Sequence, residues 1–194
     1  NFLDILQNFT VFEPVDGRVI KKIPRYQQFR AVHKTIERLK SGTTAKEKSG
    51  VIWHTQGSGK SLTMVFLSIK MRRDPELRDH KLVFLTDRTQ LDNQLTSTFK
   101  NTQKETIQHA NSVKSLKELL AKDASDIVTA MVQKFQENAD DFEFPVLNES
   151  EKIIVLADEA HRTQYGTLGA AINTALPNAP PIAFTGTPLI KTQK

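Results

Sequence analysis

One segment constrains the fold of this chain more than any other: VIWHTQGSGKSLTM, residues 51–64. A short apolar run leads into a loop with glycine at positions 57 and 59, and a helical stretch begins at Lys60 and continues to about Arg73. A strand joined to a helix by a tight glycine loop is the repeating unit of parallel α/β sheets. Because apolar runs and amphipathic stretches alternate along the rest of the chain, we predict an α/β domain with a mostly parallel central sheet and helices on both faces.

The remaining elements follow from local patterns. The Asp16-Gly17 pair predicts a tight turn between two extended pieces, and residues 25–40 have apolar side chains at helical spacing. Residues 41–50 are expected to form a polar loop, and residues 51–55 a buried strand. Ser112 is expected to cap a helix at its N-terminus. Further strands are predicted at 81–87, 106–110, 126–132, 153–160 and 181–188, and further helices at 89–99, 112–122 and 165–176.

Composition bounds the possible functions. With 194 residues the chain is long enough for one α/β domain, and its lack of cysteine excludes disulfides and thiolate metal sites. The longest apolar runs are too short to cross a bilayer, and the N-terminus lacks a secretion signal, so we expect a cytoplasmic protein without a membrane partner. The first residue is Asn rather than Met, which suggests a piece of a longer chain.

The net charge of +5 is unevenly distributed. Residues 1–50 hold ten Lys and Arg against five Asp and Glu, whereas residues 101–150 hold five against nine. A basic N-terminal part could contact phosphate backbones, although an ordinary solvated surface explains the same charges.

The glycine loop has the chemistry of a phosphate site. Gly57 and Gly59 allow positive φ angles, so that backbone N–H groups and the following helix N-terminus can surround phosphate oxygens. Lys60, which we expect to be partly exposed, can reach the β- and γ-phosphates, and the Ser61 hydroxyl can bind Mg²⁺. His54 stands where the full pattern requires glycine, so a simple glycine-rich turn remains an alternative.

A second polar segment follows an apolar run at residues 153–157. Asp158 and Glu159 come where that strand ends, at the edge where parallel sheets bind ligands. Asp158 is suited to hold Mg²⁺, and Glu159 to orient and activate the attacking water. The alternative is a polar helix start, since acids favour first turns.

Together these segments resemble a known family. The DEAH tetrad at 158–161 resembles motif II of superfamily 2 helicases and translocases, in which the first glycine of the phosphate loop is often replaced. VIWHTQGSGKSLTM, LVFLTDRTQLDNQL, VTAMVQKF, LADEAHRTQYG and AFTGTPL are together similar to the first motor lobe of the restriction subunit of type I restriction–modification enzymes. The matches extend from Arg25 to Leu189. The resemblance implies a RecA-like P-loop fold over residues 25–194, with residues 1–24 as a junction to an upstream nuclease domain.

The resemblance also implies roles for particular residues. Gln28 is expected to recognise adenine, with Gln27 as the alternative. The nucleotide and Mg²⁺ would be bound by Gln28, Thr55, Gln56, Gly57, Ser58, Gly59, Lys60, Ser61 and Asp158, and catalysis would use Lys60, Asp158 and Glu159. Nucleic-acid backbone would be contacted by Thr86, Asp87, Arg88, Thr129 and Gln133. Coupling between ATP and DNA would run through His161, Thr185, Gly186 and Thr187. For each polar residue outside the loop and the DEAH tetrad, a structural role is an equal alternative.

We therefore expect the ATP- and Mg²⁺-binding lobe of a double-stranded DNA translocase, with modification and specificity subunits as further partners. The second motor lobe, with its arginines, and the nuclease domain have no counterpart in these 194 residues. Three alternatives stay open: another superfamily 2 DNA or RNA helicase, a small-molecule phosphotransferase, and a non-catalytic ATP-gated interaction module.

Overall fold

The computed structural model describes residues 2–15, 17–55, 57–86, 107–131, 144–158 and 163–186. The predicted helix at 89–99 lies outside these ranges. So do seven of the expected site residues: Gln56, Asp87, Arg88, Gln133, Glu159, His161 and Thr187.

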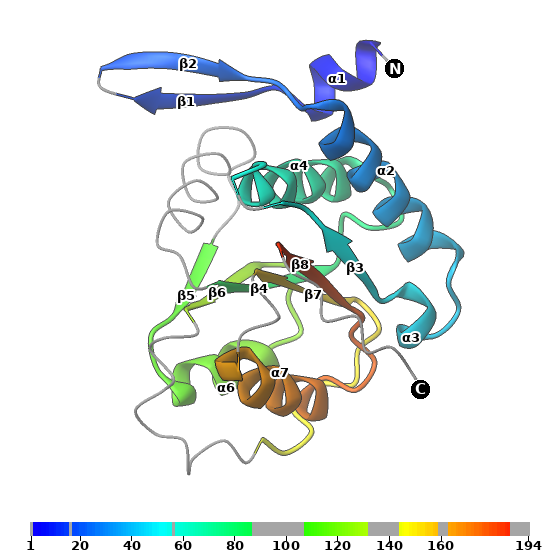
Figure 1. The fold of residues 1–194 in the computed structure, drawn as a ribbon. Coiled ribbons are helices and arrows are strands. Elements are labelled where there is room, and N and C mark those ends of the chain that lie inside the picture. The colour runs from blue at the N-terminus through cyan, green and yellow to red at the C-terminus, as the bar shows by residue number, and fades with distance from the viewer. Residues whose placement is uncertain are drawn as a thin grey trace, which may run out of the picture.

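A six-stranded sheet forms the centre of the molecule (Figure 1). Its strand order is β3-β8-β7-β4-β6-β5, and every neighbouring pair is parallel. The predicted parallel α/β architecture is confirmed. The strands are β3 (Gly50–Trp53), β4 (Lys81–Thr86), β5 (Ile107–Ala110), β6 (Ile127–Met131), β7 (Ile153–Asp158) and β8 (Pro181–Thr185).

Helices cover both faces of this sheet. On one face lie α2 (Tyr26–Ser41) and α4 (Lys60–Arg73), and on the other α6 (Val113–Ala121) and α7 (Thr163–Ala175) (Figure 1). Ser112 caps α6 as predicted, because its side chain accepts a hydrogen bond from the Ser115 amide.

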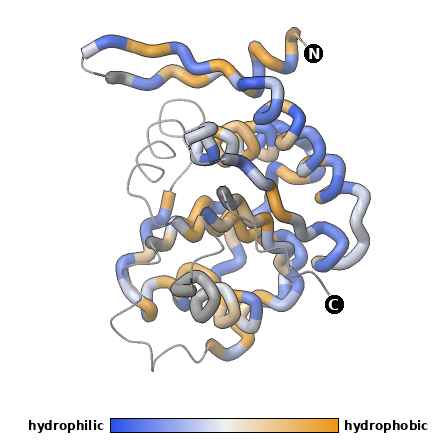
Figure 2. The backbone as a smooth tube through the Cα atoms, in the orientation of Figure 1, coloured by the Kyte–Doolittle hydropathy of each residue, from blue (hydrophilic) through white to orange (hydrophobic). Residues whose placement is uncertain are grey.

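Each face of the sheet has its own hydrophobic core. Strands β4 and β7 are buried along their whole length, which explains their uninterrupted apolar sequences. Figure 2 shows hydrophobic residues concentrated on these central strands.

Two local predictions were wrong. Strand β3 is not buried: Val51 is 64% and Trp53 65% exposed, because β3 lies at the sheet edge and pairs with β8 alone. The expected loop at 41–50 contains a one-turn helix, α3 (Ala45–Lys48). Thr44 and Glu47 form a capping box at its start, a signal already present in the sequence. Hydrogen bonds from the Thr43 hydroxyl and the Thr43 and Thr44 amides lower the pKa of Glu47 to about 2.

The N-terminal segment packs against the domain. It consists of α1 (Phe2–Asn8) and the predicted antiparallel hairpin of β1 (Val11–Val15) and β2 (Arg18–Lys22). The Asp4 carboxylate accepts hydrogen bonds from Lys70 of α4 and contacts His33 of α2, both at 2.7 Å. The hairpin projects away from the sheet (Figure 1). Within the described ranges no helix is long and apolar enough to cross a membrane.

Candidate nucleotide site

The glycine loop has the backbone geometry that the sequence predicts. Gly57 has φ of 77° and Gly59 of 87°, both in the left-handed region that favours glycine. Gly59 is also the N-cap of α4, and a Cβ atom there would lie 2.7 Å from the Gln28 amide nitrogen. Position 59 therefore requires glycine for both conformation and space. The loop delivers the chain directly to the N-terminus of α4, where free N–H groups can bind an anion.

Gln28 lies against this loop although 31 residues separate it from Gly59. Its side chain is buried at the start of α2. The Oε1 atom accepts a hydrogen bond from the Arg25 backbone N–H at 2.8 Å, and Nε2 donates to the Gly59 carbonyl at 3.0 Å. Gln28 thus links the beginning of α2 to the phosphate loop. Its role toward adenine stays a prediction.

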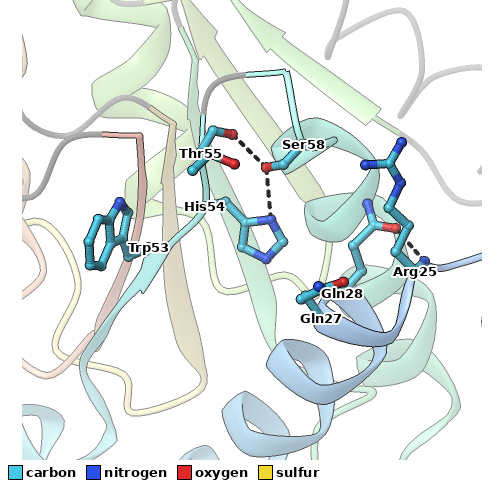
Figure 3. Close-up of a pocket in the computed structure, with 7 residues that line it drawn as sticks. All are labelled: Arg25, Gln27, Gln28, Trp53, His54, Thr55 and Ser58. Atoms are coloured by element: carbon cyan, nitrogen blue, oxygen red, sulfur yellow. Dashed lines mark hydrogen bonds between the residues drawn. The ribbon is translucent and has the colours of Figure 1, made fainter.

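His54, the departure from the glycine pattern, is part of the loop's internal structure. Its Nδ1 lies 3.1 Å from the Ser58 hydroxyl, and this hydroxyl donates to the Thr55 carbonyl at 2.5 Å (Figure 3). Burial lowers the pKa of His54, and the positive charge of Lys60 lowers it further. The ring is therefore neutral at physiological pH. Nothing in the sequence indicated this contact except the unusual residue itself.

Lys60 and Ser61 begin α4, as predicted. The expectation that Lys60 is partly exposed was wrong, because it is 6% exposed. Ser61 is half-buried, and the Thr63 hydroxyl donates to the Gly59 carbonyl at 3.0 Å, which completes the first turn.

Asp158 ends β7 at the same edge of the sheet as the glycine loop. It is 2% exposed and pairs with Phe184 of β8, and β8 separates β7 from β3. Two strand spacings correspond to about 10 Å between β3 and β7. Because all three strands are parallel, their carboxyl ends meet at one edge, the place where open α/β sheets bind ligands.

Thr185 and Gly186, two of the expected coupling residues, contact the strand that leads into the loop. The buried Thr185 accepts a backbone hydrogen bond from His54 at 3.0 Å. The Trp53 indole donates to the Gly186 carbonyl at 3.0 Å. A displacement of the end of β8 would therefore be transmitted through these two hydrogen bonds to Trp53 and His54, which precede the loop.

The two described residues expected to contact nucleic acid are buried. Thr86 ends β4, and Thr129 lies within β6 with its hydroxyl 2.9 Å from His109 Nδ1. Their hydroxyls thus lie inside the domain, which agrees with the structural alternative. Contact with DNA stays a prediction for both.

A cavity of about 400 Å³ opens beside the loop (Figure 3). The start of α2 forms one wall and the end of β3 with the loop forms the other. Three lining residues were not among the expected site residues: Arg25, Trp53 and His54. The full lining is Arg25, Gln27, Gln28, Trp53, His54, Thr55 and Ser58.

Comparison with known proteins places this chain in a family. The family of SWI2/SNF2 ATPases matches residues 27–194. The type I restriction enzyme HindI endonuclease subunit of Haemophilus influenzae is 40% identical over 97% of this chain and 20% of its own length. The type I restriction enzyme SsaAORF53P endonuclease subunit of Staphylococcus saprophyticus is 30% identical over 79% of this chain and 16% of its own. The chain thus spans about a fifth of the length of the curated relatives it matches.

Solved structures share the fold. The SWI2/SNF2 ATPase core of Sulfolobus solfataricus in complex with double-stranded DNA superposes with a TM-score of 0.56, at 16% identity over 87% of this chain and 33% of that one. A nuclease-deletion mutant of the type ISP restriction–modification enzyme LlaGI with a DNA substrate mimic gives 0.52, at 19% identity over 86% and 18%. The predicted RecA-like fold is confirmed. The chain belongs to the SWI2/SNF2 ATPase family, as a helicase-like motor lobe homologous to endonuclease subunits of type I restriction enzymes.

Proposed function

We propose that this chain is the ATP-binding lobe of a double-stranded DNA translocase within a type I restriction endonuclease. The observation that carries the proposal is the positive-φ glycine loop at the start of α4, on the same sheet edge as Asp158. The homology to type I endonuclease subunits supports DNA as the track. In the longer protein, hydrolysis would pull DNA toward the complex before a separate nuclease domain cuts. Modification and specificity subunits would be its partners.

The chain's own residues divide the chemistry among them. The loop amides and Lys60 bind the phosphates, and Glu159, next to Asp158 in the sequence, orients the attacking water. Mg²⁺ would be held by the Ser61 hydroxyl and the Asp158 carboxylate, since these hard oxygen ligands suit it. When bound, it would neutralise charge on the γ-phosphate oxygens.

The N-terminal segment would contact the upstream part of the longer protein. The hairpin exposes Phe12, Val19 and Ile20, and α1 exposes Phe2 and Leu3. A two-stranded hairpin is marginal in water by itself, so we assign this apolar surface to the junction with the nuclease domain.

Replacing Lys60 tests the function. In the full-length subunit, Lys60→Ala should abolish duplex-stimulated ATP hydrolysis and DNA cutting, because it removes the cation that neutralises the negative charge of the β- and γ-phosphates. Lys46→Ala is a matched control, since Lys46 is an exposed lysine of α3. Circular dichroism melting should show that both variants stay folded. Unchanged ATPase activity in Lys60→Ala would contradict the proposal. Stimulation by RNA instead of duplex DNA would favour a different superfamily 2 motor.

A further inference from the structure

The cavity beside the phosphate loop has the position and size of a nucleobase site. A phosphate held by the loop amides would leave the rest of the nucleotide next to Thr55 and Ser58, which line this cavity. Its volume of about 400 Å³ lies in the range of small-molecule pockets. The polar side chains around it therefore decide which base fits.

The hydrogen bonds of the loop fix the tautomer of His54. The Ser58 hydroxyl has a single proton, and it donates that proton to the Thr55 carbonyl. Toward His54 the Ser58 oxygen must therefore accept, so that Nδ1 of the neutral ring carries the hydrogen. Nε2 is then left with a lone pair, and no described residue donates a hydrogen bond to it. Since His54 lines the cavity, this lone pair is available to a ligand there.

Other polar groups of the cavity are less suited to accept a hydrogen bond from a base. The Gln28 amide already bonds to two backbone groups, the Arg25 N–H and the Gly59 carbonyl. The Arg25 guanidinium can only donate. Gln27 is exposed, so water competes for its amide.

We propose that His54 is a specificity-determining residue, and that its Nε2 accepts a hydrogen bond from the exocyclic amine of adenine. Adenine presents this donor where guanine presents a carbonyl acceptor, so the same lone pair attracts one base and repels the other. The proposal rests on the proposed ATP site and adds the group that selects the base.

Two amide substitutions separate the acceptor from the loop contact. Asparagine places its amide nitrogen near the position of Nδ1, so His54→Asn can still donate to Ser58 but has no atom at Nε2. Glutamine places its amide oxygen near Nε2, so His54→Gln keeps an acceptor and loses the Ser58 contact. Equilibrium binding to the full-length subunit should be measured for ATP, GTP and purine riboside triphosphate, which lacks the exocyclic amine.

The wild type should prefer ATP to purine riboside triphosphate by up to about tenfold, the value of one hydrogen bond. In His54→Asn this preference should vanish while affinity for purine riboside triphosphate stays unchanged. His54→Gln should keep the preference while all three nucleotides bind more weakly.

A preserved preference in His54→Asn would overturn the proposal, and so would an equal loss for all three nucleotides, because His54 would then only support the loop. Lys60→Ala separates this failure from failure of the ATP site. If Lys60→Ala binds every triphosphate as well as the wild type does, the site itself is wrong.

Discussion

At the scale of single residues, Gln28 has a structural contact with the phosphate loop, while its expected role toward adenine stays a prediction. Its amide contacts the Gly59 carbonyl and the Arg25 N–H, so its removal leaves the Arg25 N–H without this acceptor and takes one of several donors from the Gly59 carbonyl. We predict that Gln28→Ala weakens ATP and GTP binding alike, by about 1–3 kcal/mol. Calorimetry on the full-length subunit measures this, with Gln7→Ala, at an exposed glutamine of α1, as control. A loss confined to ATP would return adenine recognition to Gln28, as the family resemblance implies.

The two neighbouring acids should separate binding from turnover. Asp158→Ala should weaken Mg²⁺-dependent ATP binding, because it removes a metal ligand. Glu159→Gln should leave ATP bound but nearly unhydrolysed, because the amide cannot take a proton from water. Binding and single-turnover rates of the full-length variants check this division. If both variants lose affinity and rate to the same extent, the two carboxylates do not have distinct roles.

At the scale of elements, α1 and the chain that follows it belong to the packed domain. Phe9 is fully buried, with ring centroids 4.9 Å from Phe29 and 5.5 Å from Phe66. The predicted boundary between residues 24 and 25 therefore crosses the hydrophobic core on the α2–α4 face of the sheet. The role of residues 1–24 as a junction stays a prediction, but these residues also stabilise the domain.

A pair of phenylalanine substitutions tests this packing. Phe9→Ala should lower the free energy of unfolding by about 3–5 kcal/mol, because it leaves a cavity in the core. Phe12→Ala should change it by less than about 0.5 kcal/mol, because Phe12 is 59% exposed on the hairpin. Urea unfolding of residues 1–194 measures both. Similar values for the two variants would show that the N-terminal segment does not pack as described.

At the scale of the whole molecule, a single lobe of this kind would contact the γ-phosphate from one side only. We predict that residues 1–194 alone bind ATP–Mg²⁺ weakly and hydrolyse it very slowly, even with saturating duplex DNA. Charge on the transferred phosphoryl group needs a cation from the opposite side, and such an arginine contributes roughly 10³–10⁵ in rate. DNA binding should be weak and fall steeply with salt, since few phosphates are neutralised. Turnover near that of the full-length subunit in a steady-state assay would show that this lobe completes its own site.

The sequence by itself determined the features that depend on single residues or on residues close together in the chain. Gly57 and Gly59 mark the loop because positive φ is a property of single residues. The apolar runs of β4 and β7 predict buried parallel strands, because both faces of a covered sheet must be apolar. Asp158 could be placed at the carboxyl edge of the sheet because the alternation of strands and helices predicts parallel strands, whose carboxyl ends lie at one edge.

Only the tertiary structure decided which distant segments meet. Strand order places β3 at the edge, which exposes Val51 and Trp53 despite their apolar character. Packing of α2 on α4 brings Gln28 to Gly59, and pairing of β3 with β8 brings Trp53 to Gly186, 133 residues away. A local pattern specifies the type of an element but not its neighbour, because hydrogen bonds between distant segments depend on how the whole sheet is assembled.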